Sequence, residues 1–111
     1  MIEKIVLDYL TTSIGVPAYM ERPANPPDEY IIVEKTGSSK RNFVYTSTLA
    51  IQSYAKTLYH AAALSELVRG GMETLPELPE IGGVREGSEY NFTNPADKQC
   101  RYQAVFTIYH Y

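Results

Sequence analysis

The chain has 111 residues and a formal net charge of −3, with ten Lys and Arg against thirteen Asp and Glu. This length predicts a single domain over residues 1–111 with one modest core, and the acidic balance argues against sequence-neutral DNA or RNA binding, which needs many basic contacts to phosphate. The single Cys excludes an intrachain disulfide, and the lack of an apolar run of about 18 residues argues against a membrane span.

A first helix is expected to begin at Ile2 and to end at Gly15 and Pro17. Apolar residues recur there at helical spacing: Ile2, Ile5, Val6, Tyr9 and Leu10. The opposite face carries charged residues, unlike the apolar core of a signal peptide. We therefore expect a protein of the reducing cytoplasm, or of a particle assembled there.

Strands are expected next. Residues 18–21 can form a short strand, and residues 22–28 hold three prolines, which predicts an extended loop. The continuous apolar run of residues 30–35 predicts a strand that is buried on both faces. Residues 37–46 begin with flexible polar residues, so we expect a mobile loop whose second half joins the next strand. That strand, 46–55, places Leu49 and Ile51 on one face and Gln52 and Tyr54 on the other.

The second helix is expected over residues 56–69, with Thr57 as its N-cap. Gly70 and Gly71 either end this helix or lie within it, and continuation to Pro76 is favoured because Met72 and Leu75 keep the apolar spacing. Each glycine would then cost about 1 kcal/mol relative to Ala. We expect Gly70 and Gly71 to lie at a place where another backbone segment packs closely against the helix.

The C-terminal part predicts a loop over residues 75–83, a strand over 84–92 that kinks at Gly87, a turn over 94–97 and a terminal strand from residue 99. The terminal strand has one face expected to be core, with Cys100, Tyr102, Ala104, Phe106, Ile108 and His110. We expect its hairpin with 84–92 to be central to the sheet or to a subunit contact. The order α-β-β-β-α-β-β predicts an α+β fold with two helices packed on one mostly antiparallel sheet.

No residue pattern indicates catalysis, a cofactor or a metal site. His60 and His110 are 50 residues apart in the sequence, without Cys, Asp or Glu at metal-ligand spacing, and Cys100 has no His placed to act as its base. The carboxylates at Glu73, Glu77 and Glu80 fall in a turn-rich stretch. We expect them to form a solvated surface rather than a cleft that shifts their pKa values apart.

Two places in the sequence are candidates for contacts with other proteins. Lys40 and Arg41 form the local basic feature of the 37–46 loop, and Phe43 and Tyr45 follow directly, which together make a reasonable docking element. Tyr109 and Tyr111 lie on the side of the terminal strand opposite Phe106 and Ile108. The chain contains ten Tyr and no Trp, and Tyr suits both half-buried sheet faces and interfaces.

Three segments resemble small tail-completion proteins of long-tailed phages and prophages, the tail terminators or head–tail joining proteins. They are PANPPDEYIIVEKTG (residues 23–37), LAIQSYAKTLYHAAAL (49–64) and YNFTNPADKQCRYQAVF (90–106). The resemblance extends over nearly the whole chain. It lies in the distribution of residue types and in the order of elements, since the family has no short diagnostic motif.

The resemblance implies an α+β subunit that is not an enzyme and has no cofactor. It implies a homo-oligomeric ring, commonly a hexamer, that caps the tail tube and joins it to the head connector of the virion. DNA would pass through without tight binding, and the loop over residues 38–45 would reach a neighbouring subunit or the tube. The alternatives are another head-side connector or stopper, a small hydrolase or non-catalytic binding domain with a polar pocket, and a nucleic-acid-binding module.

Overall fold

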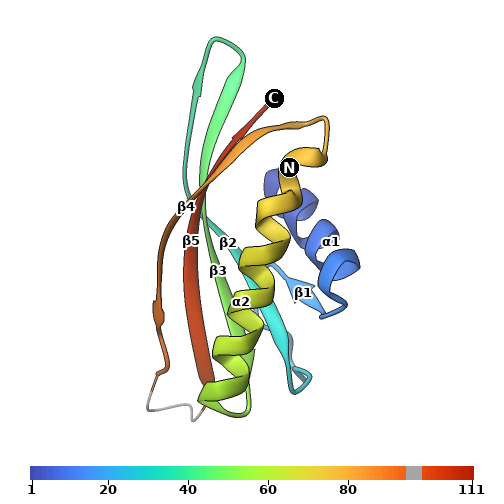
Figure 1. The fold of residues 1–111 in the computed structure, drawn as a ribbon, viewed down its shortest axis with the longest axis vertical. Helices are drawn as coiled ribbons and strands as arrows, with labels where there is room; N and C mark the ends of the chain where they lie inside the picture. Colours follow the sequence, from blue (N-terminus) through green and yellow to red (C-terminus); the bar gives the residue numbers. More distant parts are fainter. Residues whose placement is uncertain (95–98) are drawn as a thin grey trace.

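Two helices cover one face of a five-stranded sheet in the computed structural model, which describes residues 1–94 and 99–111 (Figure 1). The elements are α1 (Ile2–Ile14), β1 (Ala18–Tyr19), β2 (Tyr30–Arg41), β3 (Val44–Ala55), α2 (Leu58–Thr74), the 3₁₀ turn η1 (Leu75–Glu77), β4 (Ile81–Asn91) and β5 (Cys100–His110). The α+β class and the expected order are confirmed. The turn expected over residues 94–97 extends outside the described part of the chain.

The sheet has the strand order β1-β2-β3-β5-β4. β1 runs parallel to β2, and the remaining neighbours are antiparallel. β5 therefore has partners on both sides, while β4 is an edge strand. The hairpin expected from the two last strands exists, but only its second strand is central to the sheet.

The main core lies between the helices and the sheet. Its buried residues are Ile2, Val6 and Leu10 of α1, Val68 and Met72 of α2, Leu75 of η1, and Ile31, Val33, Leu49, Ile51, Ile81, Ala104, Phe106 and Ile108 of the strands. A second, smaller cluster contains Tyr30, Ile32 and Tyr54, with the half-buried Tyr19 packed against it. Because side chains alternate along a strand, this cluster lies on the face of the sheet without helices. Burial on both faces was expected for residues 30–35; it holds for Tyr30–Val33, whereas Glu34 and Lys35 are exposed.

Both helix boundaries follow the sequence signals. α1 ends at Gly15, which has a positive φ of 71° and whose N–H donates to the carbonyl of Thr11 at 3.0 Å. The Thr57 hydroxyl accepts the N–H of His60 at 3.1 Å, so it caps the first turn of α2. α2 then runs through both glycines. A Cβ on Gly71 would lie 2.8 Å from Cδ2 of Leu10, so α1 packs closely here through a side chain rather than the expected backbone.

The two neighbouring glycines provide a matched pair of substitutions. Gly70→Ala is expected to raise the free energy of unfolding by about 1 kcal/mol, because Ala favours the helix and no atom other than those of the adjoining helix backbone and chain neighbours lies within 4 Å of the new methyl group. Gly71→Ala is expected to gain less or to lose stability, because the fully buried Leu10 must move. Urea denaturation of both variants measures the difference. Equal stabilisation would show that Leu10 does not pack closely against Gly71.

The loop expected in the first half of residues 37–46 is wrong, whereas the second half joins the next strand as expected, because β3 begins at Val44. β2 continues to Arg41 and pairs with β3 from Gly37 opposite Thr48 to Arg41 opposite Val44. The turn consists of Asn42 and Phe43, both with positive φ, as the tight type I′ hairpin requires. The residues of β2 after Val33 are all exposed, so they lack the apolar alternation that predicts a strand. We call residues 36–46 the hairpin arm, which projects beyond the helices and the other strands (Figure 1).

β4 also begins earlier than expected, at Ile81, within the predicted 75–83 loop. Ile81 is buried and pairs with His110, although two glycines follow it and mask the strand signal. The expected irregularity at Gly87 is confirmed, because the register shifts between Glu86 and Glu89. A Cβ on Gly87 would lie 3.0 Å from the carbonyl oxygen of Val105, so glycine allows β4 to approach β5 at this point.

Candidate assembly interface

The tip of the hairpin arm presents an aromatic ring beside two positive charges. Phe43 is 83% exposed, and Nζ of Lys40 lies 5.7 Å from its ring centroid and 5.2 Å from that of Tyr45. Such cation–π contacts contribute about 0.5–1 kcal/mol at exposed sites. Within the described residues, neither Lys40 nor Arg41 forms a salt bridge. Residues 36–46 contain no Asp or Glu, so both charges are available to an acidic partner.

At the base of the arm, Tyr45 stacks on His110 with 5.3 Å between ring centroids and 14° between ring planes. Nε2 of His110 lies 2.8 Å from Oγ of Ser47. A cavity of about 310 Å³ opens here, lined by Met1, Ile2, Ile5, Lys35, Ser38, Tyr45, Ser47, His110 and Tyr111. Burial lowers the pKa of His110, and the charges of Lys35 and the N-terminal amine lower it further, while Glu3 has the opposite effect.

This lowered pKa predicts a pH dependence of stability. The unfolded chain has a His pKa of about 6.5, so it binds more protons than the folded chain as the pH falls below that value. The contribution of His110 is therefore fully present above about pH 6.5 and is lost as the pH falls through the lower pKa of the folded state. Between about pH 7.5 and about pH 5, wild type should lose more unfolding free energy than His110→Gln. Urea denaturation at both pH values tests this, and parallel losses would contradict it.

The six residues proposed from the sequence do not form one patch. Lys40, Phe43 and Tyr45 come together at the arm, and Tyr111 lines the cavity next to Tyr45. Tyr109 precedes His110 in β5, so it points to the opposite face of the sheet from Tyr45, the register partner of His110. Arg41 is adjacent to Lys40 in β2 and, by the same alternation, shares the face of Tyr109. Separating these two groups requires the register between β3 and β5, which local residue patterns do not specify.

A hydrogen-bond network that the sequence did not indicate covers the helix-free face. Nε2 of Gln52 donates to Oε1 of Gln103 at 3.0 Å, and Nε2 of Gln103 donates to the Tyr90 hydroxyl at 2.5 Å. The Tyr54 hydroxyl donates to Oε1 of Gln52 at 2.9 Å and accepts Nη1 of Arg101 at 2.8 Å. The alternation of 46–55 placed Gln52 and Tyr54 on this face, but their partners depend on strand order. The network satisfies polar groups of this face within the chain itself.

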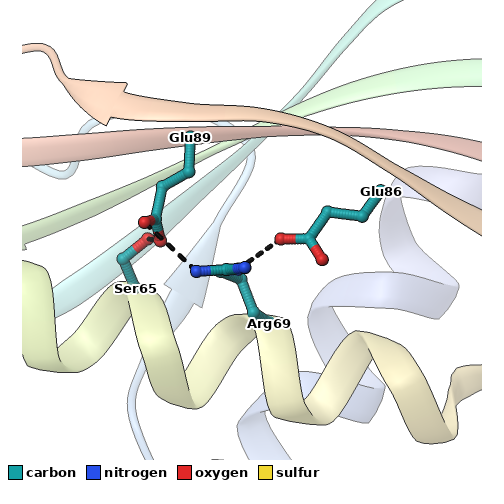
Figure 2. Close-up of polar contacts among 4 residues, drawn as sticks. All are labelled: Ser65, Arg69, Glu86 and Glu89. Carbon is teal, nitrogen blue, oxygen red and sulfur yellow. Dashed lines mark hydrogen bonds and ion pairs between the residues drawn. The ribbon is translucent and has the colours of Figure 1, made fainter.

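An ionic cluster joins α2 to β4 on the other face (Figure 2). Nη1 of Arg69 lies 3.3 Å from Oε1 of Glu89, and Nε of Arg69 donates to Oε1 of Glu86. The Ser65 hydroxyl donates to Oε2 of Glu89 at 2.6 Å. The hydrogen bond from Arg69 to Glu86, together with the charges of Glu89 and Glu86, raises the pKa of the guanidinium. Arg69 is thus a bridge between two carboxylates of the edge strand.

A cavity of about 190 Å³ adjoins this cluster. Its lining combines apolar groups with charges: Arg69, Met72, Glu73, Pro76, Val84, Glu86 and Phe106. Glu73, Glu77 and Glu80 are exposed, as expected, and Glu73 also lies on the edge of this cavity. We call this feature the α2–β4 cavity. Local sequence patterns do not predict this cavity, because its lining depends on the packing of β4 against α2.

The arrangement offers little for catalysis. The contact between Ser47 and His110 resembles part of a nucleophile–base pair, but Ser47 is only 1% exposed. Within residues 1–94 and 99–111, no hydrogen bond to a carboxylate orients the His110 ring as in a triad. In the same residues, no group of three or more His, Cys, Asp or Glu side chains is placed to hold a metal ion. No helix in this part of the chain is long and apolar enough to cross a membrane.

Comparisons with known proteins find the fold in a solved structure. No family model matches the chain, and no curated protein matches it. The fold is similar to that of a chain from a structure described as "Virion of native gene transfer agent (GTA) particle", with a TM-score of 0.59 and 10% sequence identity. The similarity covers 97% of this chain and 92% of that one. At this identity, the similarity concerns the fold.

Proposed function

We propose that this chain is a structural subunit of a phage-like virion, and more specifically a tail terminator or head–tail joining protein. The observation that carries the proposal is the similarity of the fold to a chain of a gene transfer agent virion, which covers 97% of this chain and 92% of that one. The resemblance of residues 23–37, 49–64 and 90–106 to tail-completion proteins points in the same direction. The chain would act at the head–tail junction after assembly in the bacterial host cytoplasm, without catalysis or cofactor.

The physical features agree with a ring through which DNA passes. A homo-oligomeric ring, proposed as a hexamer, needs two different patches on each subunit. The hairpin arm and the α2–β4 cavity are two such patches, and they differ in charge and shape. A net charge of −3 limits attraction to phosphate, since each Lys or Arg contact adds salt-dependent affinity. The proposed partners are the tail-tube protein on one side and the head connector protein on the other.

Assembly with and without the tail tube tests the proposal. The purified chain is studied by light scattering over a wide concentration range and by negative-stain microscopy, alone and with tail tubes of the same phage or prophage. Rings with a central hole, or caps on one end of the tubes, are expected. A chain that stays monomeric at high concentration and does not bind the tubes would overturn the proposal. Both parts are needed because assembly can require the tube as a template.

Another head-side connector or stopper is the second candidate, because the similarity to a virion chain applies equally to it. Ring symmetry and the protein that co-purifies with the ring separate the two. Capture of the tail-tube protein supports a terminator, whereas capture of the head connector alone supports a stopper. DNA binding at low ionic strength is a further check, because a nucleic-acid-binding module would show strongly salt-dependent affinity.

A further inference from the structure

The hairpin arm has an exposed end for which its own chain provides no pocket. Phe43 is 83% exposed at a turn in which it adopts a φ of 69°, a conformation that is rare for a bulky side chain. Leaving a large apolar ring in water at the end of a projecting strand pair gives no gain to the isolated subunit. Lys40 lies against this ring and Arg41 is next to it, so any partner would meet an apolar group flanked by positive charge.

The α2–β4 cavity has the complementary properties. Its apolar lining comes from Met72, Pro76, Val84 and Phe106, and Glu73 and Glu86 contribute carboxylates. The positive charge of Arg69 is already engaged by Glu86 and Glu89. The acidic character continues past the cavity, because residues 73–80 include Glu73, Glu77 and Glu80 without any Lys or Arg.

The arm of a given subunit and its own cavity belong to different parts of the sheet. The arm is formed by β2 and β3, whereas the cavity lies at β4, on the far side of β5 in the strand order. Within a single subunit, Phe43 is exposed and does not occupy the α2–β4 cavity of the same chain. A contact between the two features therefore joins two copies, and because the patches differ, it is a head-to-tail contact of the kind that closes rings.

We propose that the hairpin arm of one subunit inserts Phe43 into the α2–β4 cavity of a second copy of this chain, with Lys40 facing Glu73 and Arg41, on the other face of the arm, directed to the acidic residues beyond it. Opposite charges favour this pairing over an arm-to-arm contact, which would bring like charges together. The inference rests on the proposed function, since it supplies the subunit contact that a ring requires.

Cross-linking between two single-cysteine variants tests the contact. Phe43→Cys and Glu73→Cys are each prepared in a Cys100→Ser background, checked for folding by circular dichroism, mixed, and treated with a short bismaleimide. A covalent dimer is expected in the mixture, well above the yield of either variant alone. Tyr59→Cys mixed with Glu73→Cys is the matched control, because Tyr59 is also an aromatic residue on the surface, 77% exposed. Equal yields from Phe43→Cys and Tyr59→Cys would overturn the inference.

Charge reversal provides a second, independent readout. Lys40→Glu with Arg41→Glu, and separately Glu73→Lys with Glu77→Lys, should each weaken self-association at least about tenfold. Mixing the two reversed proteins should restore association, whereas no recovery would contradict the pairing.

If wild type forms rings while Phe43→Ala also forms them normally, the inference fails and the proposed function stands. If Phe43→Ala loses only the binding to tail tubes, the arm serves the tube protein and the inference fails. If wild type neither self-associates nor binds tubes, both fail.

Discussion

Replacing Phe106 by Ala is expected to lower the free energy of unfolding by about 3–5 kcal/mol. Phe106 is 1% exposed and lies on β5, between β3 and β4, where it is opposite Leu49 and Glu86. It contacts the core beneath the helices and also lines the α2–β4 cavity. The truncation therefore removes buried apolar surface and opens new volume next to an existing cavity. Urea denaturation of the purified variant measures the loss.

Phe43→Ala is the matched control for this prediction. It removes the same atoms from a side chain that is 83% exposed and whose ring contacts Lys40, so the free energy of unfolding should fall by no more than about 1 kcal/mol. Because a domain of this size has a total stability of about 5–15 kcal/mol, Phe106→Leu serves as a milder variant if Phe106→Ala does not fold. Similar losses from Phe43→Ala and Phe106→Ala would mean that the assignment of core and arm is wrong.

The expected core face of β5 is confirmed because it depends on local alternation alone. Ala104, Phe106 and Ile108 are buried, as the two-residue period of a strand predicts. The hairpin arm follows the opposite rule. Its β2 residues are exposed on both faces of the strand, so polar residues are tolerated at every position. The two-residue alternation of apolar and polar residues that predicts a strand is therefore absent there. The strand persists there because β3 supplies hydrogen-bonding partners.

In the candidate interface too, local sequence patterns predict some contacts and not others. Lys40, Phe43 and Tyr45 are close in the sequence, and a tight turn brings them together. Their proximity therefore does not depend on the order or register of the other strands. The separation of Tyr109 from Tyr45 depends on the register between β3 and β5, which places His110 opposite Tyr45. The α2–β4 cavity likewise requires Arg69 to meet Glu86 across a helix–strand contact. Such relations come from packing between distant segments, which local patterns do not encode.

Tyr30→Ala is expected to destabilise the fold by about 3–5 kcal/mol, comparable to a truncation in the main core. Tyr30 is fully buried although it lies on the face without helices. Its ring stacks on Tyr54 with 4.6 Å between centroids, and Tyr19 meets it edge-on at 6.2 Å. Its hydroxyl donates to Oε1 of Gln99 at 3.1 Å, and burial raises its pKa. The measurement is again the free energy of unfolding in urea.

Tyr30→Phe separates the ring from the hydroxyl group. It keeps the stack on Tyr54 and removes the hydrogen bond to Gln99, so a loss of about 0.5–1.5 kcal/mol is expected. If Tyr30→Ala lowers the free energy of unfolding by less than about 0.5 kcal/mol, the face without helices has no core of its own. The distinction matters for assembly because Tyr30 begins β2, the strand that ends in the hairpin arm. If its small core fixes β2 to the sheet, Tyr30→Phe should still assemble like wild type, since the arm keeps its direction when the ring remains in place.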